Sequence, residues 1–176
     1  MLLFALLLLT AQIAQTPTPA AQLLTRVYPV CAGVRVLAPN LATQPRDLIF
    51  SGRQILDLQF QACLRQDLPG DHVMQFKVLT PGGFLYRVLT VPFVGTAAGP
   101  PPPRAVPGYP RPLPVQTLVP TAGDSRMRAF YSVSTALPVA GTSITLSSLY
   151  GPWTVQAFLD GQSDPCGPAT RFTIRD

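Results

Sequence analysis

The chain has 176 residues, and its 13 lysine and arginine residues outnumber its 8 acidic residues to give a formal net charge of +5. This length fits one domain. All acidic residues are aspartate and Lys77 is the only lysine, and because glutamate and lysine favour helix surfaces, this composition argues against exposed helices. The arginines form no cluster longer than Arg126-Met127-Arg128, so solvated strand faces explain them better than a nucleic-acid site.

The N-terminus has the pattern of a secretory signal peptide. Residues 1–9 are an unbroken apolar run, and a polar, proline-containing segment follows at 15–19. The run is shorter than the roughly 20 residues that a membrane-spanning helix needs. We therefore predict a signal peptide over residues 1–20, a periplasmic or secreted location and no transmembrane span in the mature chain. Cleavage is expected after Ala11, Ala14 or Ala20, and the alternative is a buried N-terminal segment of a cytosolic protein.

The first half of the mature chain reads as strands. An N-terminal strand is predicted at 27–37. Residues 56–65 alternate strictly between apolar and polar, which is the pattern of a half-buried strand, and the apolar positions are Leu56, Leu58, Phe60, Ala62 and Leu64. Residues 72–93 are predicted to form a hairpin, because Thr80-Pro81-Gly82-Gly83 supplies turn residues between two strand-like segments.

Residues 95–114 contain eight prolines, four of them consecutive at 100–103. Proline is excluded from helix interiors and central strands, so this stretch is predicted to be an extended loop or linker. Neither half of the chain has enough strands to close a sandwich alone. We therefore expect the stretch to connect one sheet to the other within a single domain over 24–176. A docking ligand for a proline-reading domain is the alternative.

Further strands are predicted after the prolines, at 115–119, 127–136, 142–149 and 170–174. Trp153 starts the best-patterned strand of this half. Trp153, Val155, Ala157 and Leu159 share one face of that strand, which we interpret as the core face. Asp160-Gly161 then predicts a tight hairpin, because both residues tolerate positive φ.

About seven to nine short strands without helical periodicity predict an all-β fold, a β-sandwich. The segment Leu149-Tyr150-Gly151-Pro152-Trp153-Thr154-Val155, followed by the turn Leu159-Asp160-Gly161, resembles the closing hairpin of immunoglobulin-like and fibronectin-type modules of bacterial secreted proteins. The likeness covers the last third of the chain and the 72–93 hairpin. It implies a single immunoglobulin-like sandwich of antiparallel strands with a proline-rich inter-strand loop. The Cys…Trp…Cys spacing of immunoglobulin domains is absent, so strand order stays open.

Three cysteines, Cys31, Cys63 and Cys166, are too few and too far apart for a CxxC zinc or redox site. In an oxidising compartment two of them are expected to pair. We favour Cys31 with Cys166, because they border the predicted first and last strands, which often lie side by side in such sandwiches. Cys31 with Cys63, or three separate thiols, are the alternatives.

His72 is the only histidine, which restricts acid–base and metal chemistry. A soft copper site of His72 with Met74 and Met127 is one interpretation, but Met74 alternates with core-type residues, which favours packing. The sequence has no G-x-S-x-G, phosphate loop or metalloprotease motif. We therefore expect no catalytic residue, no metal and no cofactor. A hydrolase using His72 with Asp71, or the pair Asp160 and Asp164, is kept as a distant alternative.

These observations favour an exported, non-catalytic module with a binding, assembly or structural role at or outside the cell envelope. Its expected partner is another protein or an envelope component, not nucleic acid. The leading alternative is a carbohydrate-binding domain that stacks surface aromatics on sugar rings, and a hydrolase comes after it. Tyr150, Tyr109 and Tyr86 are the candidate contacts for a protein partner or a polysaccharide.

Overall fold

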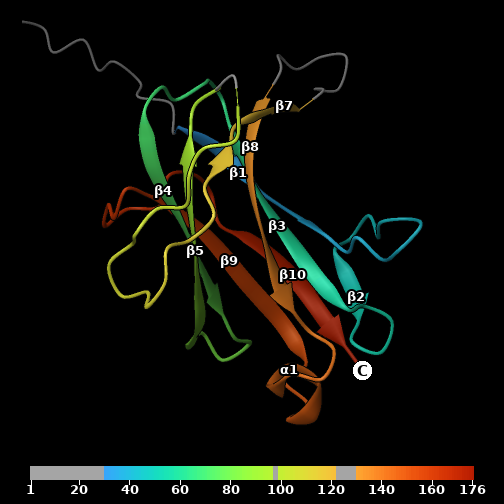
Figure 1. Ribbon diagram of the computed structural model, residues 1–176. Helices are drawn as coiled ribbons and strands as arrows, with labels where there is room; N and C mark the ends of the chain where they lie inside the picture. Colours follow the sequence, from blue (N-terminus) through green and yellow to red (C-terminus); the bar gives the residue numbers. More distant parts are fainter. Residues whose placement is uncertain (1–29, 97–98, 122–129) are drawn as a thin grey trace, which may run out of the picture.

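The computed structural model describes residues 30–96, 99–121 and 130–176. Within them the chain forms ten strands and one four-residue helix around a single hydrophobic core (Figure 1). The elements are β1 (Cys31–Leu37), β2 (Ile49–Ser51), β3 (Asp57–Leu64), β4 (Asp71–Leu79), β5 (Leu85–Val94), β6 (Gln116–Thr117), β7 (Val119–Thr121), β8 (Phe130–Pro138), α1 (Ser143–Leu146), β9 (Gly151–Leu159) and β10 (Thr170–Arg175). The predicted signal peptide, the start of the predicted 27–37 strand and Met127 lie outside the described residues.

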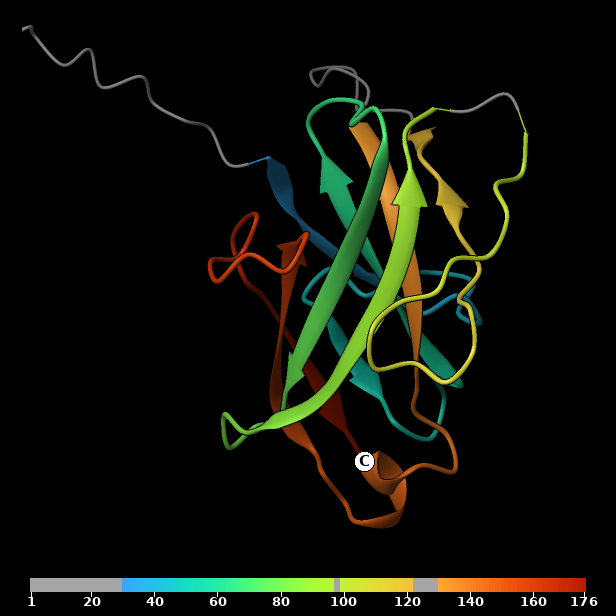
Figure 2. The ribbon, with the colours of Figure 1, turned by 60° about the vertical axis from the view of Figure 1, so that its left-hand side comes forward.

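The strands form two sheets, which confirms the all-β prediction. One sheet has the order β1-β3-β8-β7 and the other the order β2-β10-β9-β4-β5-β6 (Figure 2). The prediction that all strands are antiparallel is wrong at two places, because β2 pairs in parallel with β10 and β6 in parallel with β5. Parallel neighbours need a long connection: the proline-containing stretch joins β5 to β6, and β3 to β9 lie between β2 and β10 in the chain.

The core follows the predicted alternation. On β3, the side chains of Leu58, Phe60, Ala62 and Leu64 are fully buried. On β9, the predicted core face is also buried, from Trp153 to Leu159. Leu56 departs from the pattern, because it precedes β3 and is exposed. The backbone C=O of Leu56 instead accepts hydrogen bonds from the N–H groups of Val139 and Ala140, after the end of β8.

β4 and β5 form the predicted antiparallel hairpin. The proline stretch that follows returns to the same sheet, where β6 pairs with the end of β5. It is tied to β4 by Arg104, which forms an ion pair with Asp71 and donates to the C=O of His72. The predicted sheet-to-sheet connection therefore does not lie here. The chain changes sheet at Leu118, a buried residue between β6 and β7, because its side chain enters the core between the two sheets.

The strand predicted at 142–149 is wrong, since this segment contains α1. Thr142 caps the turn, and its side-chain oxygen accepts a hydrogen bond from the N–H of Ile144. In a strand Ile144 and Leu146 would point to the same face. Here Ile144 is buried and Leu146 is exposed, so local capping outweighs the apparent alternation.

The turn predicted at Asp160-Gly161 has positive φ at both residues, 50° and 71°. The tight hairpin is wrong, however, because β10 begins only at Thr170. The Asp160 carboxylate accepts a hydrogen bond from the N–H of Val73, and the loop that follows contains Cys166. This longer loop lets the chain reach β1.

Cys31 and Cys166 form the predicted disulfide, with their Cα atoms 5.2 Å apart. The bond joins the two sheets, because Cys31 starts β1 and Cys166 precedes β10. The first and last strands therefore lie in different sheets, not side by side in one. Gly167 permits the close approach, since a Cβ there would lie 2.5 Å from the backbone oxygen of Cys31. Cys63 is a free, buried cysteine.

Candidate functional site

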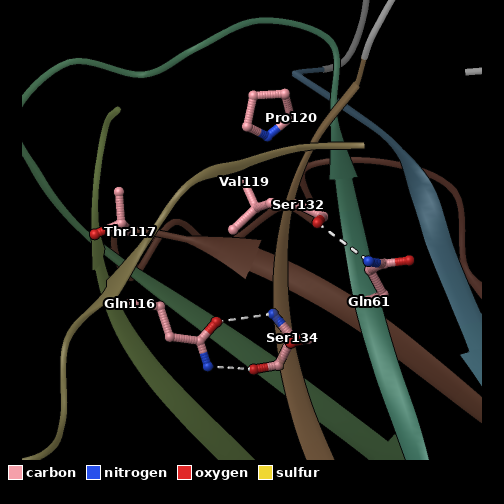
Figure 3. Close-up of a pocket in the computed structure, with 7 residues that line it drawn as sticks. All are labelled: Gln61, Gln116, Thr117, Val119, Pro120, Ser132 and Ser134. Carbon is pink, nitrogen blue, oxygen red and sulfur yellow. Dashed lines mark hydrogen bonds between the residues drawn. The ribbon is translucent and has the colours of Figure 1, made fainter. Parts of the chain in front are cut away.

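The outward face of the four-stranded sheet, beside β6, carries a groove lined by uncharged residues (Figure 3). Its position follows from strand alternation: Phe60, Ala62 and Val133 are buried in the core, so the neighbours of these residues point outward. These neighbours are Gln61 on β3 and Ser132 and Ser134 on β8. The side-chain N–H of Gln61 donates to the hydroxyl of Ser132 at 3.1 Å.

The side chain of Gln116 pairs with the backbone of β8 as a strand residue would. Its Nε2 donates to the C=O of Ser134 at 2.6 Å, and its Oε1 accepts from the N–H of Ser134 at 3.1 Å (Figure 3). A carboxamide offers one acceptor and a donor with the geometry of a peptide group. The two bonds therefore reproduce the pair of N–H···O=C hydrogen bonds that two facing residues exchange in an antiparallel strand pair. They show that the edge of β8 accepts a peptide-like group at Ser134.

The groove has a volume of about 690 Å³ and is lined only by uncharged groups. The lining residues are Gln61, Gln116, Thr117, Val119, Pro120, Ser132 and Ser134. The carboxamides and hydroxyls of these residues offer hydrogen-bond partners, while apolar atoms, including those of Val119 and Pro120, contribute the larger part of the lining surface. Val119 is an exposed apolar side chain at the rim. Such a lining suits an uncharged ligand that has both polar and apolar groups, as a peptide segment does.

The open edge of β8 continues below the groove. β7 pairs only with residues 130–132, and Ser134 is bonded by Gln116. Since N–H and C=O groups alternate between the two sides of a strand, those of Ala136 point to the same side as those of Ser134. No hydrogen bond from the described residues reaches them, and Ala136 is exposed. Backbone groups are thus available for a further strand.

None of the three candidate tyrosines lines this groove. Tyr86 and Tyr150 are partly buried against the core. The ring of Tyr86 meets Trp153 edge-on with centroids 5.2 Å apart, and its hydroxyl lies 2.8 Å from that of Ser143. Tyr109 is exposed within the proline stretch. Of the three tyrosines, Tyr109 is therefore the exposed one.

Both ring nitrogens of His72 have acceptors as neighbours. Nδ1 lies 2.8 Å from the carboxylate of Asp160 and Nε2 lies 3.3 Å from the C=O of Pro69. No serine or cysteine of the described residues is its hydrogen-bond partner, so His72 is not arranged as the base of a nucleophile. Met74 is buried in the core, Asp164 is exposed, and the described residues contain no cluster of three metal-ligating side chains.

Burial raises the pKa of the Cys63 thiol, and the nearby Arg35 lowers it by a smaller amount. The thiol therefore stays protonated at neutral pH, and the thiolate is the reactive form. We expect iodoacetamide to alkylate native protein slowly and unfolded protein rapidly at pH 7. Mass spectrometry with and without denaturant measures both rates, and equal rates would contradict the burial of this thiol.

Comparisons of the chain with protein-family models, with curated proteins and with solved structures give no match. In the described part of the chain, no helix has the length and apolar character needed to cross a membrane. The groove and the β8 edge were not predicted from sequence. Gln116 lies in a two-residue strand after eight prolines, and no periodic pattern marks it.

Proposed function

We propose that this protein is an exported, non-catalytic module of the immunoglobulin-like sandwich type, which holds an extended segment of another protein by strand addition along β8. The observation that carries the proposal is the pairing of the Gln116 carboxamide with both backbone groups of Ser134. A side chain that imitates a peptide group marks a position where a real peptide fits. In strand addition, main-chain hydrogen bonds supply affinity and pockets for alternate side chains supply specificity.

The bound segment would lie in line with β7, next to Ser134 and Ala136. It would displace the Gln116 side chain and then pair with the free backbone groups of Ala136. Alternate side chains of the segment would enter the groove between Gln61 and Val119. Because the groove is lined by uncharged residues, with amide and hydroxyl groups beside apolar surface, the preferred segment carries uncharged residues there.

Two further observations support an extracytoplasmic module. The Cys31–Cys166 disulfide fits an oxidising compartment, and the apolar run at 1–9 fits a signal peptide. Two packed sheets agree with the architecture that the resemblance to immunoglobulin-like modules implies. The carbohydrate alternative has less support, because Tyr86 and Tyr150 pack against the core.

Ala136→Pro tests the proposal, because proline removes the outward N–H without touching the bonds from β8 to β3. Ala136→Ser is the matched control, since it keeps the N–H. Random ten-residue peptides displayed on phage are selected on the wild-type protein, and the dissociation constants of the selected peptides are measured by calorimetry. We expect the proline variant to bind at least about tenfold more weakly, the effect of one lost backbone bond and a steric block, and the serine variant to bind as wild type.

Hydrogen exchange locates the peptide independently of affinity. A bound peptide should slow exchange of the Ala136 amide, which no described residue protects. Selected peptides that bind the proline variant equally well, or that protect a different strand, would show that the β8 edge is not the binding site.

A further inference from the structure

Three large apolar side chains are exposed at one end of the molecule. Phe84 and Leu85, in and after the turn between β4 and β5, are 77% and 57% exposed, and Leu146 on α1 is 78% exposed. Figures 1 and 2 both place this turn and α1 at the same end, opposite β7. Single exposed apolar residues are ordinary, but a group of them at one end indicates an interaction surface.

The two segments that carry these residues are held together. The hydroxyl of Tyr86 lies 2.8 Å from that of Ser143, which links β5 to α1. A Cβ added at Gly151 would lie 3.0 Å from Pro81, so the turn also packs against the start of β9. Because Ile144 is buried in the core, α1 is fixed with Leu146 directed outward. The turn that carries Phe84 and Leu85 and the helix that carries Leu146, here called the apolar tips, are therefore held in place before any partner binds.

The charge pattern around these tips fits a lipid surface. Residues 80–86 and 139–151 contain no charged side chain. Arg87 lies two residues after Leu85 on β5, Arg175 follows Ile174, which pairs with Gly151, and Arg53 follows Gly52, which donates to the C=O of Arg175. The Asp176 carboxylate pairs with Arg53, and Arg53 in turn lowers the pKa of Asp176. Within the described residues no carboxylate forms an ion pair with Arg87 or Arg175.

Charges are costly among acyl chains, whereas arginine is favoured beside anionic headgroups. Uncharged tips with apolar side chains and basic residues behind them meet both conditions. We propose that this end of the protein docks on an anionic lipid bilayer, with Phe84, Leu85 and Leu146 inserted at the interface and Arg87 and Arg175 at the headgroups. β7, and the start of β8 that pairs with it, lie at the opposite end of the molecule (Figure 1).

Sedimentation with vesicles tests this docking on the full chain. The vesicles contain phosphatidylcholine alone, or phosphatidylcholine with about one third phosphatidylglycerol. We expect wild-type protein to bind the anionic vesicles, and Phe84→Ser with Leu146→Ser to reduce its partition coefficient at least about tenfold. Val119→Ser is the matched control, since Val119 is similarly exposed, at 59%, but lies on β7. It should bind as wild type.

Arg87→Gln with Arg175→Gln should weaken binding to the anionic vesicles, and added salt should do the same. Circular dichroism checks that every variant is folded.

Wild-type protein that binds neither vesicle, or a Phe84 and Leu146 variant that binds as well as wild type, would overturn the proposal. A third outcome is that wild-type protein self-associates and binds no vesicles, while the Phe84 and Leu146 variant no longer self-associates. That result would assign the surface to a second copy of the chain and would also overturn the membrane proposal. Peptide binding at β8 is measured separately, so either result stands without the other.

Discussion

Replacing Trp153 with alanine is expected to lower the free energy of unfolding by about 3 to 5 kcal/mol, through lost burial and the cavity left behind. Trp153 is fully buried. Its ring stacks on Phe172 and meets Tyr86 edge-on, and its N–H donates to the C=O of Leu149 at 3.1 Å. Because a domain has a total stability of about 5 to 15 kcal/mol, this loss threatens folding. Denaturant titration followed by far-UV circular dichroism measures it.

Leu146→Ala is the control for this experiment, because Leu146 is exposed and its truncation should change the free energy of unfolding by about 0.5 kcal/mol or less. The loss of unfolding free energy in Trp153→Phe should lie between those of Leu146→Ala and Trp153→Ala, since phenylalanine keeps an aromatic ring but has no N–H donor. A melting temperature that changes by less than about 2 °C in Trp153→Ala would contradict the core role and favour a ligand platform.

Replacing both Cys31 and Cys166 with serine is expected to lower the free energy of unfolding by about 4 to 5 kcal/mol. The disulfide spans 135 positions in sequence, so its loss restores much conformational entropy to the unfolded chain. The same bond joins the two sheets, and the N–H of Cys31 also donates to the C=O of Cys166 at 2.9 Å. Denaturant titration of the oxidised protein and the variant gives the difference.

Cys63→Ala is the matched control, because it removes the free cysteine and leaves the disulfide. We expect it to cost about 1 kcal/mol or less. Alkylation of the unfolded, unreduced protein should label one thiol. Labelling of all three cysteines, or equal stabilities of the wild type and the double variant, would refute the stabilising role of the bond.

Much of the fold could be predicted because period-two alternation depends only on which residues must be buried. β3, the β4–β5 hairpin and β9 all carry this pattern, and each lies close to its expected position. The disulfide was predicted from its position beside the first and last strands, and the bond forms. Its geometry differs from the expectation, because sequence patterns do not determine which strands share a sheet.

The errors occurred where a local interaction competes with the pattern. At 142–149 the capping bond of Thr142 produces a helical turn from an alternating segment. At 115–119 one apparent strand divides between two sheets, because Leu118 enters the core. A side-chain cap and a change of sheet both leave the alternation of apolar and polar residues almost unchanged. The sequence pattern therefore does not reveal either of them.

The candidate site was beyond prediction for a related reason. The bonds from Gln116 to Ser134 join residues that are 18 positions apart, and they depend on how far β7 extends along β8. Tyr86, Tyr109 and Tyr150 are candidate contacts because of their residue type, which does not determine whether they are buried. Burial is a property of the assembled fold, and it places Tyr86 and Tyr150 against the core.

The position of β10 sets the order in which the molecule can assemble. This strand lies inside the six-stranded sheet, between β2 and β9, and its side chains Phe172 and Ile174 belong to the core. Ile49 and Phe50 of β2 pair with Thr173 and Ile174, so this early strand has no neighbour in its sheet until the last strand arrives. β2 therefore joins its sheet only once nearly the whole chain is present, and such distant pairings slow folding.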